Sequence, residues 1–536
     1  MTKVRPFGRG FIWAPTGTEA NAFDQMAIEK HKVPQTTLIE CAGRSVAQVL
    51  DRIFPDGEVV GIIGSGNNGS DGIVLLRTLK SWGRSVKAVL VADRSLDDPL
   101  LHGWDVHILN DGVVSKVDDG DGNEGDDCGV PINSILDSAS VVVDCILGTG
   151  IKGAPRPRQT QAIRAINRSR CPVLALDTPS GIDCDTGCIE GEAVTAQVTV
   201  ALGWPKLGTL LHPGRDKVGR LISVEIGFPP AEENYFGAAV VTPEWAVEKR
   251  PERDTDTHKN RVGALLLVAG NYGMAGAVIM AARSALRAGV GLLRIVSTAE
   301  NRDIIQSSVP EAVFVSGDDL DAVVKSASSS HAVAVGPGLG EGPEVFKLLE
   351  IVRDATVGIP TVLDADALNS AASGHAPSVK SWSMGQGVLV TPHIGEMNRL
   401  SGLSSDVIVK NRILSARSLA VRSGAVVLLK GLPSVVAPPD GICWIDTVGT
   451  SDLATGGMGD VLTGVAGALL SQGLTPDIAG ALSLYITGRA AVLADKGRSL
   501  TPSDVIDEIS SVWDESGVGE TDLDLPFVVF DQDVAR

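Results

Sequence analysis

The stretch GSGNNGSDG, residues 64–72, follows the apolar run EVVGII at residues 58–63 and precedes a helical pattern near residues 71–81. An apolar run, a glycine-rich turn and a helix in this order are typical of α/β folds, which bind ligands where parallel strands end. Glycine lets a ligand approach the backbone closely, and free N–H groups at the start of a helix favour an anion. A tight turn does not need the amides of Asn67 and Asn68 and the carboxylate of Asp71, so the stretch is a candidate ligand site.

The alternation of strands and helices extends over both halves of the chain. Strands of the N-terminal half are expected at residues 58–63, 85–92, 140–147, 172–177 and 196–203, with a second helix near 159–168. Strands of the C-terminal half are expected at residues 264–270, 291–297, 331–338, 360–366, 387–392 and 425–431, with a helix at 275–289. Both halves are therefore predicted to be α/β with parallel strands.

The length of the chain predicts more than one hydrophobic core, because 536 residues exceed the size of one core. Proline, glycine and charged residues interrupt the pattern at residues 228–242. We therefore expect an N-terminal domain of residues 1–230 and a C-terminal domain of residues 240–536.

Composition argues against several classes of protein. A net charge of −19 argues against nucleic-acid binding, which requires a basic face. No apolar run approaches the ~18 residues of a membrane span, and residues 1–15 lack the apolar core of a signal peptide. The seven scattered cysteines, of which Cys184 and Cys188 are the closest pair, are expected to be reduced thiols in a cytoplasmic protein.

The segment DDGDGNEGDD at residues 118–127 carries six carboxylates among ten residues. It lacks the spacing and the flanking helices of an EF-hand calcium site. We interpret it as a solvated surface loop, with a cation-binding loop as the alternative.

Two further polar clusters follow strands of the N-terminal half. DCILGTGIKGAPR begins with Asp144 at the end of one strand, and LDTPSGIDCDTG places Asp177 and Ser180 at the end of another. Because the carboxyl ends of parallel strands meet at one edge of a sheet, the three clusters are expected to converge. Asp183 or Asp185 is interpreted more simply as a helix N-cap.

The C-terminal half contains a comparable turn, DLATGGMGDVLTG at residues 452–464, in which Asp460 opens an apolar helix. Backbone amides there form an anion hole, and the carboxylate can take a proton from a hydroxyl that accepts a phosphoryl group. An N-capped helix after a flexible turn is the alternative. Other strand ends in VLLKGLPSVV, TPHIGE, VGPGLG and DADALN contribute Lys430, Ser434, His393, Gly338, Gly340, Asp364 and Asp366.

The three N-terminal motifs, with LIECAG at residues 38–43, resemble the YjeF N-terminal domain family of NAD(P)H-hydrate epimerases over residues 16–228. The resemblance implies a Rossmann-like three-layer domain that interconverts the R and S epimers of hydrated NADH and NADPH. It implies a potassium ion held by Asn68, Asp144 and Ser180. It also implies substrate contacts from Asn67, Asn68, Gly69, Ser70, Asp71, Gly148, Thr149, Gly150, Ile151, Lys152, Gly153, Ala154 and Asp177. Asp144 is the predicted acid–base residue, because opening and reclosing the hydrated ring requires a carboxylate at the ring.

Two residues depart from that family's pattern. Ser70 stands where glycine is usual, and Ser65 stands where proline or a similar residue is usual. A serine reduces backbone freedom slightly and adds a hydroxyl, so neither change is expected to disturb the site.

The C-terminal motifs AGNYGMAGA, VGPGLG, LDADALN, TPHIGE, LKGLPS and ATGGMGD resemble, in this order, the ribokinase-like NAD(P)H-hydrate dehydratases over residues 243–515. The resemblance implies that ADP, with Mg²⁺, or ATP in eukaryotic relatives, drives dehydration of the S hydrate. Asp460 would deprotonate the C6 hydroxyl, which attacks the terminal phosphate, and AMP and phosphate result. Expected substrate contacts are Ala277, Gly338, Gly340, His393 and Asp460, and expected nucleotide contacts are Lys430, Gly431, Leu432, Pro433, Ser434 and Gly459. Met458 replaces the usual threonine or serine, and Ser434 replaces a common threonine.

Together the two halves predict a repair enzyme for hydrated NADH and NADPH. A dehydratase that accepts one epimer leaves the other unrepaired, and an epimerase on the same chain converts it to the accepted form. The alternatives are a ribokinase-like vitamin kinase and an N-terminal half that only binds a nucleotide. The expected partners are the two hydrates and ADP, without nucleic acid or membrane, and a homo-oligomer is expected. ADP and ATP, and the hydrates of NADH and NADPH, stay open as alternatives.

Overall fold

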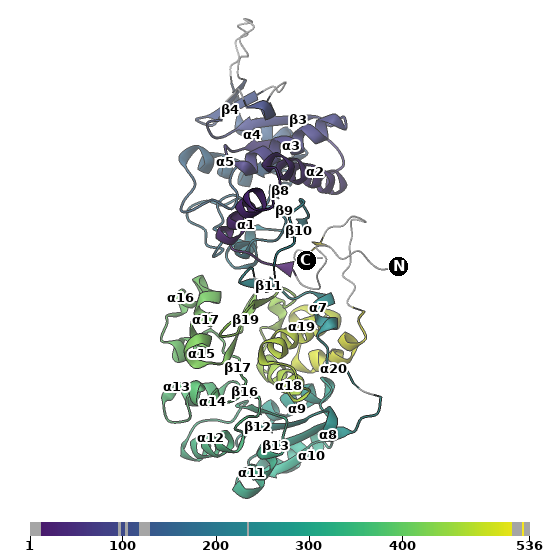
Figure 1. Ribbon diagram of the computed structural model, residues 1–536, viewed down its shortest axis with the longest axis vertical. Coiled ribbons are helices and arrows are strands. Elements are labelled where there is room, and N and C mark those ends of the chain that lie inside the picture. Colours follow the sequence, from purple (N-terminus) through teal and green to yellow (C-terminus); the bar gives the residue numbers. More distant parts are fainter. Residues whose placement is uncertain are drawn as a thin grey trace, which may run out of the picture. The chain divides into compact units, whose positions relative to one another are not determined.

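The computed structural model describes residues 12–94, 98–101, 106–116, 129–232, 235–253, 255–516 and 528–529. The chain divides into two compact units at Phe236 and Gly237, inside the segment where the sequence pattern is interrupted. Each unit is built around a β-sheet with helices packed on it (Figure 1). The acidic segment 118–127 and Cys128 lie outside the described residues, whereas the other six cysteines are free thiols. The predicted limits of the functional domains, 1–230 and 240–536, stay predictions.

The first unit contains a mixed sheet with the strand order β21-β10-β9-β8-β7-β2-β3-β4-β5-β6. Neighbours from β10 to β4 are parallel, and β21, β5 and β6 pair antiparallel. The predicted strands β2, β3, β7, β8 and β9 are confirmed. The strands of this unit are β1 (Ile12–Trp13), β2 (Val59–Ile63), β3 (Val86–Leu90), β4 (Val106–Asn110), β5 (Val113–Lys116), β6 (Val130–Pro131), β7 (Val141–Cys145), β8 (Val173–Leu176), β9 (Val198–Leu202), β10 (Arg220–Val224) and β21 (Val528–Val529).

Helices cover both faces of this sheet, and the buried residues of β2 alternate between two apolar cores. Val59 and Ile63 belong to one apolar core with residues of α2 and α3, whereas Val60 and Ile62 belong to another with residues of α4 and α5. Successive side chains of a strand point to opposite faces, so the sheet is the middle of three layers. The helices are α1 (Gly17–Glu29), α2 (Gln35–Ile53), α3 (Asn67–Ser81), η2 (Pro99–Leu101), α4 (Ile132–Ser138), α5 (Pro157–Arg168), α6 (Leu207–Leu210) and η3 (Gly214–Lys217).

The sheet of the second unit follows the order β11-β20-β19-β18-β17-β16-β15-β12-β13-β14. It is parallel except at β19, which pairs antiparallel with both of its neighbours. The predicted strands β12, β13 and β15 to β18 are confirmed. The strands are β11 (Ala238–Val240), β12 (Ala264–Val268), β13 (Leu292–Ser297), β14 (Val313–Ser316), β15 (Ala332–Val335), β16 (Thr361–Leu363), β17 (Val388–Val390), β18 (Val426–Leu429), β19 (Ser434–Ala437) and β20 (Cys443–Asp446).

Helix α18 lies against the sheet and packs closely on α9, since a Cβ on Gly464 would stand 2.0 Å from the carbonyl oxygen of Ala281. Helix α19 is long and apolar enough to cross a membrane, although no apolar run of that length was expected, but 67% of its apolar window is buried in the unit. It packs on α18 and α20, which is the arrangement of a core helix. The helices are α7 (Pro243–Glu248), α8 (Lys259–Val262), α9 (Ala275–Arg287), η4 (Ala299–Asn301), α10 (Arg302–Ser308), α11 (Leu320–Ser328), α12 (Pro343–Ala355), α13 (Asp366–Ser373), α14 (Val379–Trp382), α15 (Ile394–Ser401), α16 (Ser405–Lys410), α17 (Arg412–Ser423), η5 (Ser451–Leu453), α18 (Met458–Ser471), α19 (Pro476–Ala494), η6 (Gly497–Ser499) and α20 (Pro502–Trp513).

Candidate active sites

The turn GSGNNGSDG joins β2 to α3, and α3 begins at Asn67 with Gly66 as its N-cap. Two of its glycines are required by close packing. A Cβ on Gly64 would lie 2.0 Å from the carbonyl oxygen of Ile146, and a Cβ on Gly69 would lie 2.1 Å from that of Gly64. A Cβ on Gly66, by contrast, would have no neighbour within 4 Å. The turn is therefore packed tightly at its base and open at the start of α3.

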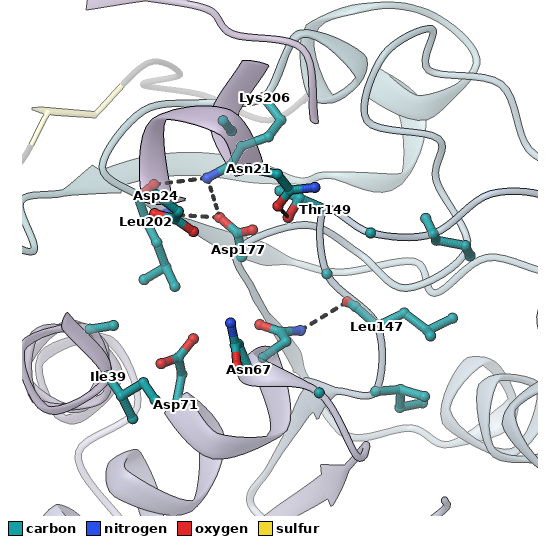
Figure 2. A pocket seen from close by; sticks show the side chains of 18 of the residues that line it. Asn21, Asp24, Ile39, Asn67, Asp71, Leu147, Thr149, Asp177, Leu202 and Lys206 are labelled. Atoms are coloured by element: carbon teal, nitrogen blue, oxygen red, sulfur yellow. Dashed lines mark hydrogen bonds and ion pairs between the residues drawn. The ribbon is translucent and has the colours of Figure 1, made fainter. Parts of the chain in front are cut away.

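A cavity of about 580 Å³ opens at this turn and brings the three N-terminal clusters together. Figure 2 shows Asp71 of α3 and Asp177, which follows β8, on opposite sides of it. The expected substrate contacts that line it are Asn67, Asn68, Asp71, Gly148, Thr149, Gly150, Ile151, Lys152, Ala154 and Asp177. The expected residues that are not part of its lining are Gly69, Ser70, Gly153, Asp144 and Ser180.

Asn68, Asp144 and Ser180 are buried and linked by hydrogen bonds, since Ser180 bonds Asp144 and shares the carbonyl of Leu147 with Asn68. The carboxylate of Asp144 accepts hydrogen bonds from Ser180 Oγ at 2.6 Å, from the N–H of Ser180 at 2.7 Å and from the N–H of Ile146 at 3.2 Å. Asn68 donates from Nδ2 to the carbonyl of Leu147 at 2.8 Å, but its buried Oδ1 has no hydrogen-bond partner. Burial raises the pKa of Asp144 to about 6, although the hydrogen bonds from Ser180 and Ile146 oppose this shift. A buried, unpaired amide oxygen is costly unless a ligand satisfies it.

Ser70, one of the two departures from the resembled family, is bonded within the scaffold of the turn. Its Oγ accepts a hydrogen bond from Arg94 Nη2 at 2.7 Å, and Arg94 is also paired with Asp98 at 2.7 Å. Arg94 donates further to the carbonyl of Gly64 at 3.2 Å. The added hydroxyl therefore helps to hold the arginine that braces the turn.

The hydrogen bonds of Asp183 and Asp185 show that the expected helix N-cap at these positions is wrong. Asp183 Oδ1 accepts from the N–H groups of Asp185 and Thr186, both at 2.9 Å, and so closes a turn. Asp185 accepts from the N–H of Thr18, in the first turn of α1, at 3.1 Å and pairs with Lys152 at 2.7 Å. These short-range bonds of an aspartate produce a turn as readily as a helix start, and the sequence alone does not separate the two.

A second group of residues in the cavity was missed from the sequence. It comes from α1 and α2 and from the segments after β9 and β10, and includes Asn21, Asp24, Leu38, Ile39, Trp204, Lys206 and Phe228. Lys206 ends GWPK at residues 203–206, directly after a predicted strand, so the rule that found the other clusters could have found it. Asp24 lies inside α1 and gives no comparable signal.

Three carboxylates in the cavity, those of Asp24, Asp71 and Asp177, share one neighbouring ammonium, that of Lys206. Burial raises the pKa of Asp24 to about 6, against the opposing effect of Lys206. Burial and the charges of Asp177 and Asp24 raise the pKa of Asp71 well above its ordinary value. The surroundings of the cavity therefore favour the protonated forms of Asp24 and Asp71 more than water does.

In the second unit, Asp460 lies in the first turn of α18, and Gly457, not Asp460, is the N-cap. Gly457 has a φ of 93°, and a Cβ there would lie 2.6 Å from Met280 Sδ, so glycine is required. Burial, with a contribution from Asp364, raises the pKa of Asp460 to about 7. A carboxylate with a pKa near neutral is suited to accept a proton. The side chain of Met458 leaves the N–H groups at this helix start in place.

Lys430 connects three segments at the start of α18. Its Nζ lies 2.7 Å from Asp364 Oδ1 and 3.9 Å from Glu396 Oε2, and Thr463 Oγ1 donates to Asp364 Oδ2 at 2.7 Å. A Cβ on Gly459 would stand 3.5 Å from Lys430 Nζ. Burial lowers the pKa of Lys430, but the carboxylates of Asp364 and Glu396 outweigh it and the pKa is raised. The site therefore keeps a fixed positive charge beside the helix N-terminus.

His393 is the N-cap of α15, and its Nδ1 accepts the N–H of Gly395 at 2.9 Å. Its Nε2 lies 3.4 Å from Glu396 Oε1. Burial and the positive charges of Lys430 and Arg399 lower the pKa of His393. These effects disfavour the charged imidazole, and the acceptor role of Nδ1 leaves Nε2 as the ring nitrogen that faces Glu396.

The loops VGPGLG and AGNYGMAGA lie against each other. Gly338 and Gly340 have φ angles of 58° and 73°, and a Cβ on Gly338 would stand 3.1 Å from Ala277 Cβ. The N–H of Gly340 donates to Asp366 Oδ2 at 2.7 Å. The structure thus brings together three of the expected substrate contacts, Ala277, Gly338 and Gly340.

The expected nucleotide segment, residues 430–434, forms the turn from β18 to β19. Ser434 Oγ accepts the N–H of Gly431 at 3.1 Å and donates to its carbonyl at 2.8 Å, so this hydroxyl is bonded inside the turn. Leu432 is exposed, whereas Pro433 is buried. The buried Arg412, which was missed from the sequence, donates to the carbonyl of Lys430 at 3.2 Å and lies beside Gly431.

Two family models match the chain, one for each unit. The model described as YjeF-related protein N-terminus matches residues 35–208, and the model described as NAD(P)H-hydrate dehydratase matches residues 265–511. The first lies within the first unit and the second within the second.

Curated relatives match both parts in one chain. The chain is 34% identical to a bifunctional NAD(P)H-hydrate repair enzyme of Moorella thermoacetica, covering 91% of this chain and 93% of the relative. It is 35% identical to that of Salinibacter ruber, covering 93% and 95%, and 33% identical to that of Escherichia coli, covering 84% and 83%. A solved ADP/ATP-dependent NAD(P)H-hydrate dehydratase from Bacillus subtilis is 31% identical, covers 51% of this chain and 96% of its own, and has a TM-score of 0.44.

Proposed function

Since the chain belongs to the family of bifunctional NAD(P)H-hydrate repair enzymes, we propose that it restores hydrated NADH and NADPH by two reactions. The first unit interconverts the R and S hydrates, and the second dehydrates the S hydrate with ADP, which gives AMP and phosphate. ATP is the alternative nucleotide. A vitamin kinase and a non-catalytic N-terminal half are weaker proposals, because relatives in this family match both parts of the chain.

The observation that carries this proposal is that one chain holds two separate groups of buried or half-buried carboxylates with raised pKa values, each at the carboxyl edge of its own sheet. The first is the cavity of about 580 Å³ at the end of β2, β7 and β8, with buried carboxylates around it. The second is the start of α18, where the pKa of Asp460 is raised to about 7 beside Lys430. Epimerisation and dehydration of a hydroxylated ring both need such groups.

Potassium fits the side chains of Asn68, Asp144 and Ser180 in the first unit. Asn68 Oδ1 is buried and unpaired, Ser180 bonds Asp144, and Asn68 and Ser180 both donate to the carbonyl of Leu147. We propose that these three side chains hold the ion, which would supply a fixed positive charge next to the cavity and satisfy the amide oxygen. Mg²⁺ would arrive with the nucleotide, because it is commonly bound by one or two carboxylates together with substrate phosphates.

In the second unit we propose that Asp460 takes the proton of the C6 hydroxyl as that oxygen attacks the terminal phosphate of ADP. The N–H groups at the start of α18 and the ammonium of Lys430 stabilise the phosphate charge. The phosphorylated oxygen then leaves with its electron pair as phosphate, and loss of a proton from C5 restores the ring double bond. Ala277, Gly338, Gly340 and His393 would border the hydrate, and residues 430–434 with Gly459 the nucleotide. A cytoplasmic location and a homo-oligomeric state stay predictions.

The test is an absorbance assay at the reduced-nicotinamide band with the full chain, ADP and a mixture of both epimers. Recovery of all the absorbance supports both activities. Recovery of half shows that the first unit does not epimerise, and no recovery overturns the dehydratase. A phosphorylated product that persists, without release of phosphate, would favour the vitamin kinase.

A further inference from the structure

Lys206 and Asp177 form the most enclosed ion pair that faces the cavity of the first unit. Lys206 Nζ lies 2.5 Å from Asp177 Oδ1 and 2.8 Å from the carbonyl oxygen of Leu202. The two residues are only 4% and 6% exposed, yet both belong to the cavity lining. A buried ion pair that nonetheless faces a ligand cavity is a candidate for direct contact with the ligand.

Each member of the pair keeps hydrogen-bonding capacity for a ligand. An ammonium has three donors, and Lys206 uses two of them on the described residues, for Asp177 and Leu202. Asp177 Oδ1 accepts hydrogen bonds from Lys206 and from the N–H of Leu202 at 3.1 Å. Its Oδ2 accepts no hydrogen bond from the described residues. One N–H and one carboxylate oxygen are therefore available next to each other.

The backbone of Asp177 has an unfavourable conformation at the position of the ion pair. Its φ of 68° lies in the left-handed region, which a residue with a Cβ adopts at a cost in free energy. Its N–H is fixed to the carbonyl of Val200 at 2.8 Å. Strained residues of this kind concentrate at functional sites, and the carboxylate of Asp177 lies against Lys206 (Figure 2).

Two other carboxylates of the unit, those of Asp144 and Asp71, are less suited to touch the reacting ring. Asp144 is 0% exposed, its two oxygens accept three hydrogen bonds, and it is not part of the cavity lining. Asp71 faces the cavity, but burial and neighbouring charges favour its protonated form. Asp177 is the carboxylate that faces the cavity with a bonded ammonium beside it.

We propose that Asp177 and Lys206 are catalytic residues that open and reclose the hydrated nicotinamide ring, while Asp144 acts at the ion. This rests on the proposed epimerase function. Asp177 Oδ2 takes the proton of the C6 hydroxyl while the N1–C6 bond breaks, its electron pair passes to N1, and C6 becomes an aldehyde whose oxygen accepts from Lys206. The proton passes from Asp177 to N1. Rotation about the C5–C6 bond presents the other face of the aldehyde, N1 attacks it, and the proton returns to the C6 oxygen, so no oxidant or reductant is needed.

The test measures epimerisation and dehydration separately in full-length variants. Lys206→Met and Asp177→Asn should each lower the rate of R-to-S conversion on the order of 10²- to 10⁴-fold, with little change in the KM for the hydrate. Dehydration of pure S hydrate by the second unit should stay normal and serves as the internal standard of folded protein. Lys217→Met is the matched control, because Lys217 bonds Thr195 on the same unit and is not part of the cavity lining.

Removal of one buried charge can unfold the unit, so the double variant Lys206→Met with Asp177→Asn decides between structure and chemistry. It removes both charges and keeps the side-chain volumes, so thermal unfolding should resemble the wild type while epimerisation stays lost. A folded Lys206→Met or double variant that epimerises at close to the wild-type rate overturns the inference. A wild-type chain that does not epimerise overturns the proposed function instead, before any variant is compared.

Discussion

The two sites of this chain share the same local backbone structure but differ in how their carboxylates are bonded. In both, a glycine-rich turn leads into a helix that has a glycine N-cap, Gly66 for α3 and Gly457 for α18. Beside the glycine-rich turn before α3, the carboxylate of Asp144 accepts three hydrogen bonds and is fully buried. The carboxylate of Asp460, at the glycine-rich turn before α18, is half-buried and accepts no hydrogen bond from the described residues.

This difference separates a carboxylate that holds a ligand from one that moves a proton. Donors fix the oxygens of Asp144 in place and oppose the rise of its pKa, which is what an ion site requires. Asp460 keeps both oxygens free and has a pKa raised to about 7, which is what a general base requires. The predictions below test whether this division of roles is correct.

The largest effect is expected for Asp460→Asn, which keeps the shape of the side chain but removes the base. Dehydration of the S hydrate should fall on the order of 10²- to 10⁴-fold. ADP affinity should change little or tighten slightly, because backbone N–H groups hold the phosphates and a nearby negative charge is removed. ADP titration calorimetry and a rate assay measure both. Asparagine replaces aspartate well near a helix start, so near-normal dehydration would mean that Asp460 only stabilises α18.

The pH dependence of dehydration should follow the same carboxylate. Only the ionised form of Asp460 accepts a proton, and its pKa is about 7. The rate at limiting substrate should therefore fall as pH decreases through 7, by about 50- to 100-fold between pH 8 and pH 5. The residual rate of Asp460→Asn should lack this dependence. A wild-type profile that is flat over this range contradicts the assignment.

The next effect is expected for Asp144→Ala in the first site. Loss of a residue that merely orients a metal ligand typically lowers affinity or activity by about 10- to 100-fold, so loss of the ligand Asp144 should lower epimerisation by at least this amount while dehydration is spared. Replacing choline chloride by potassium chloride should raise the unfolding temperature of the wild type but not of the variant. Loss of both activities would indicate misfolding. Loss of epimerisation with an unchanged potassium response would place Asp144 outside the ion site.

The sequence predicted the central strands and the polar residues that directly follow them, because the rule of strand ends applies to both. It did not identify Asp24, whose position on a polar face of α1 looks like any solvated helix residue. Lys206 follows a predicted strand but lacks the glycines that marked the other clusters. The strands β4 to β6, at one edge of the first sheet, and β20, near one edge of the second sheet, were missed because they are short or mix polar with apolar residues. Which carboxylate faces the cavity depends on packing between segments far apart in the sequence, and Asp144 and Asp177 are alike in local pattern.

The smallest effect is expected at Ser70, which belongs to the scaffold of the first site rather than to its cavity. Ser70→Ala removes the hydrogen bond from Arg94 and should destabilise the first unit by about 1–2 kcal/mol, since Asp98 and the carbonyl of Gly64 still hold the arginine. Ser70→Gly, the residue usual in the resembled family, removes the same bond and adds about 1 kcal/mol for glycine inside a helix.

Epimerisation by both variants should stay within about twofold of the wild type. The hydrogen bond between Arg94 and Ser70 lies outside the cavity lining, so its removal should change the stability of the unit more than the reaction rate. Thermal unfolding and the epimerase rate, measured on the same preparations, check the two parts. Equal unfolding temperatures for the alanine variant and the wild type would show that the bond to Arg94 contributes nothing. A large loss of epimerisation in a stable Ser70 variant would place Ser70 in the cavity's chemistry, and would weaken the contrast between a fixed scaffold and free reacting groups.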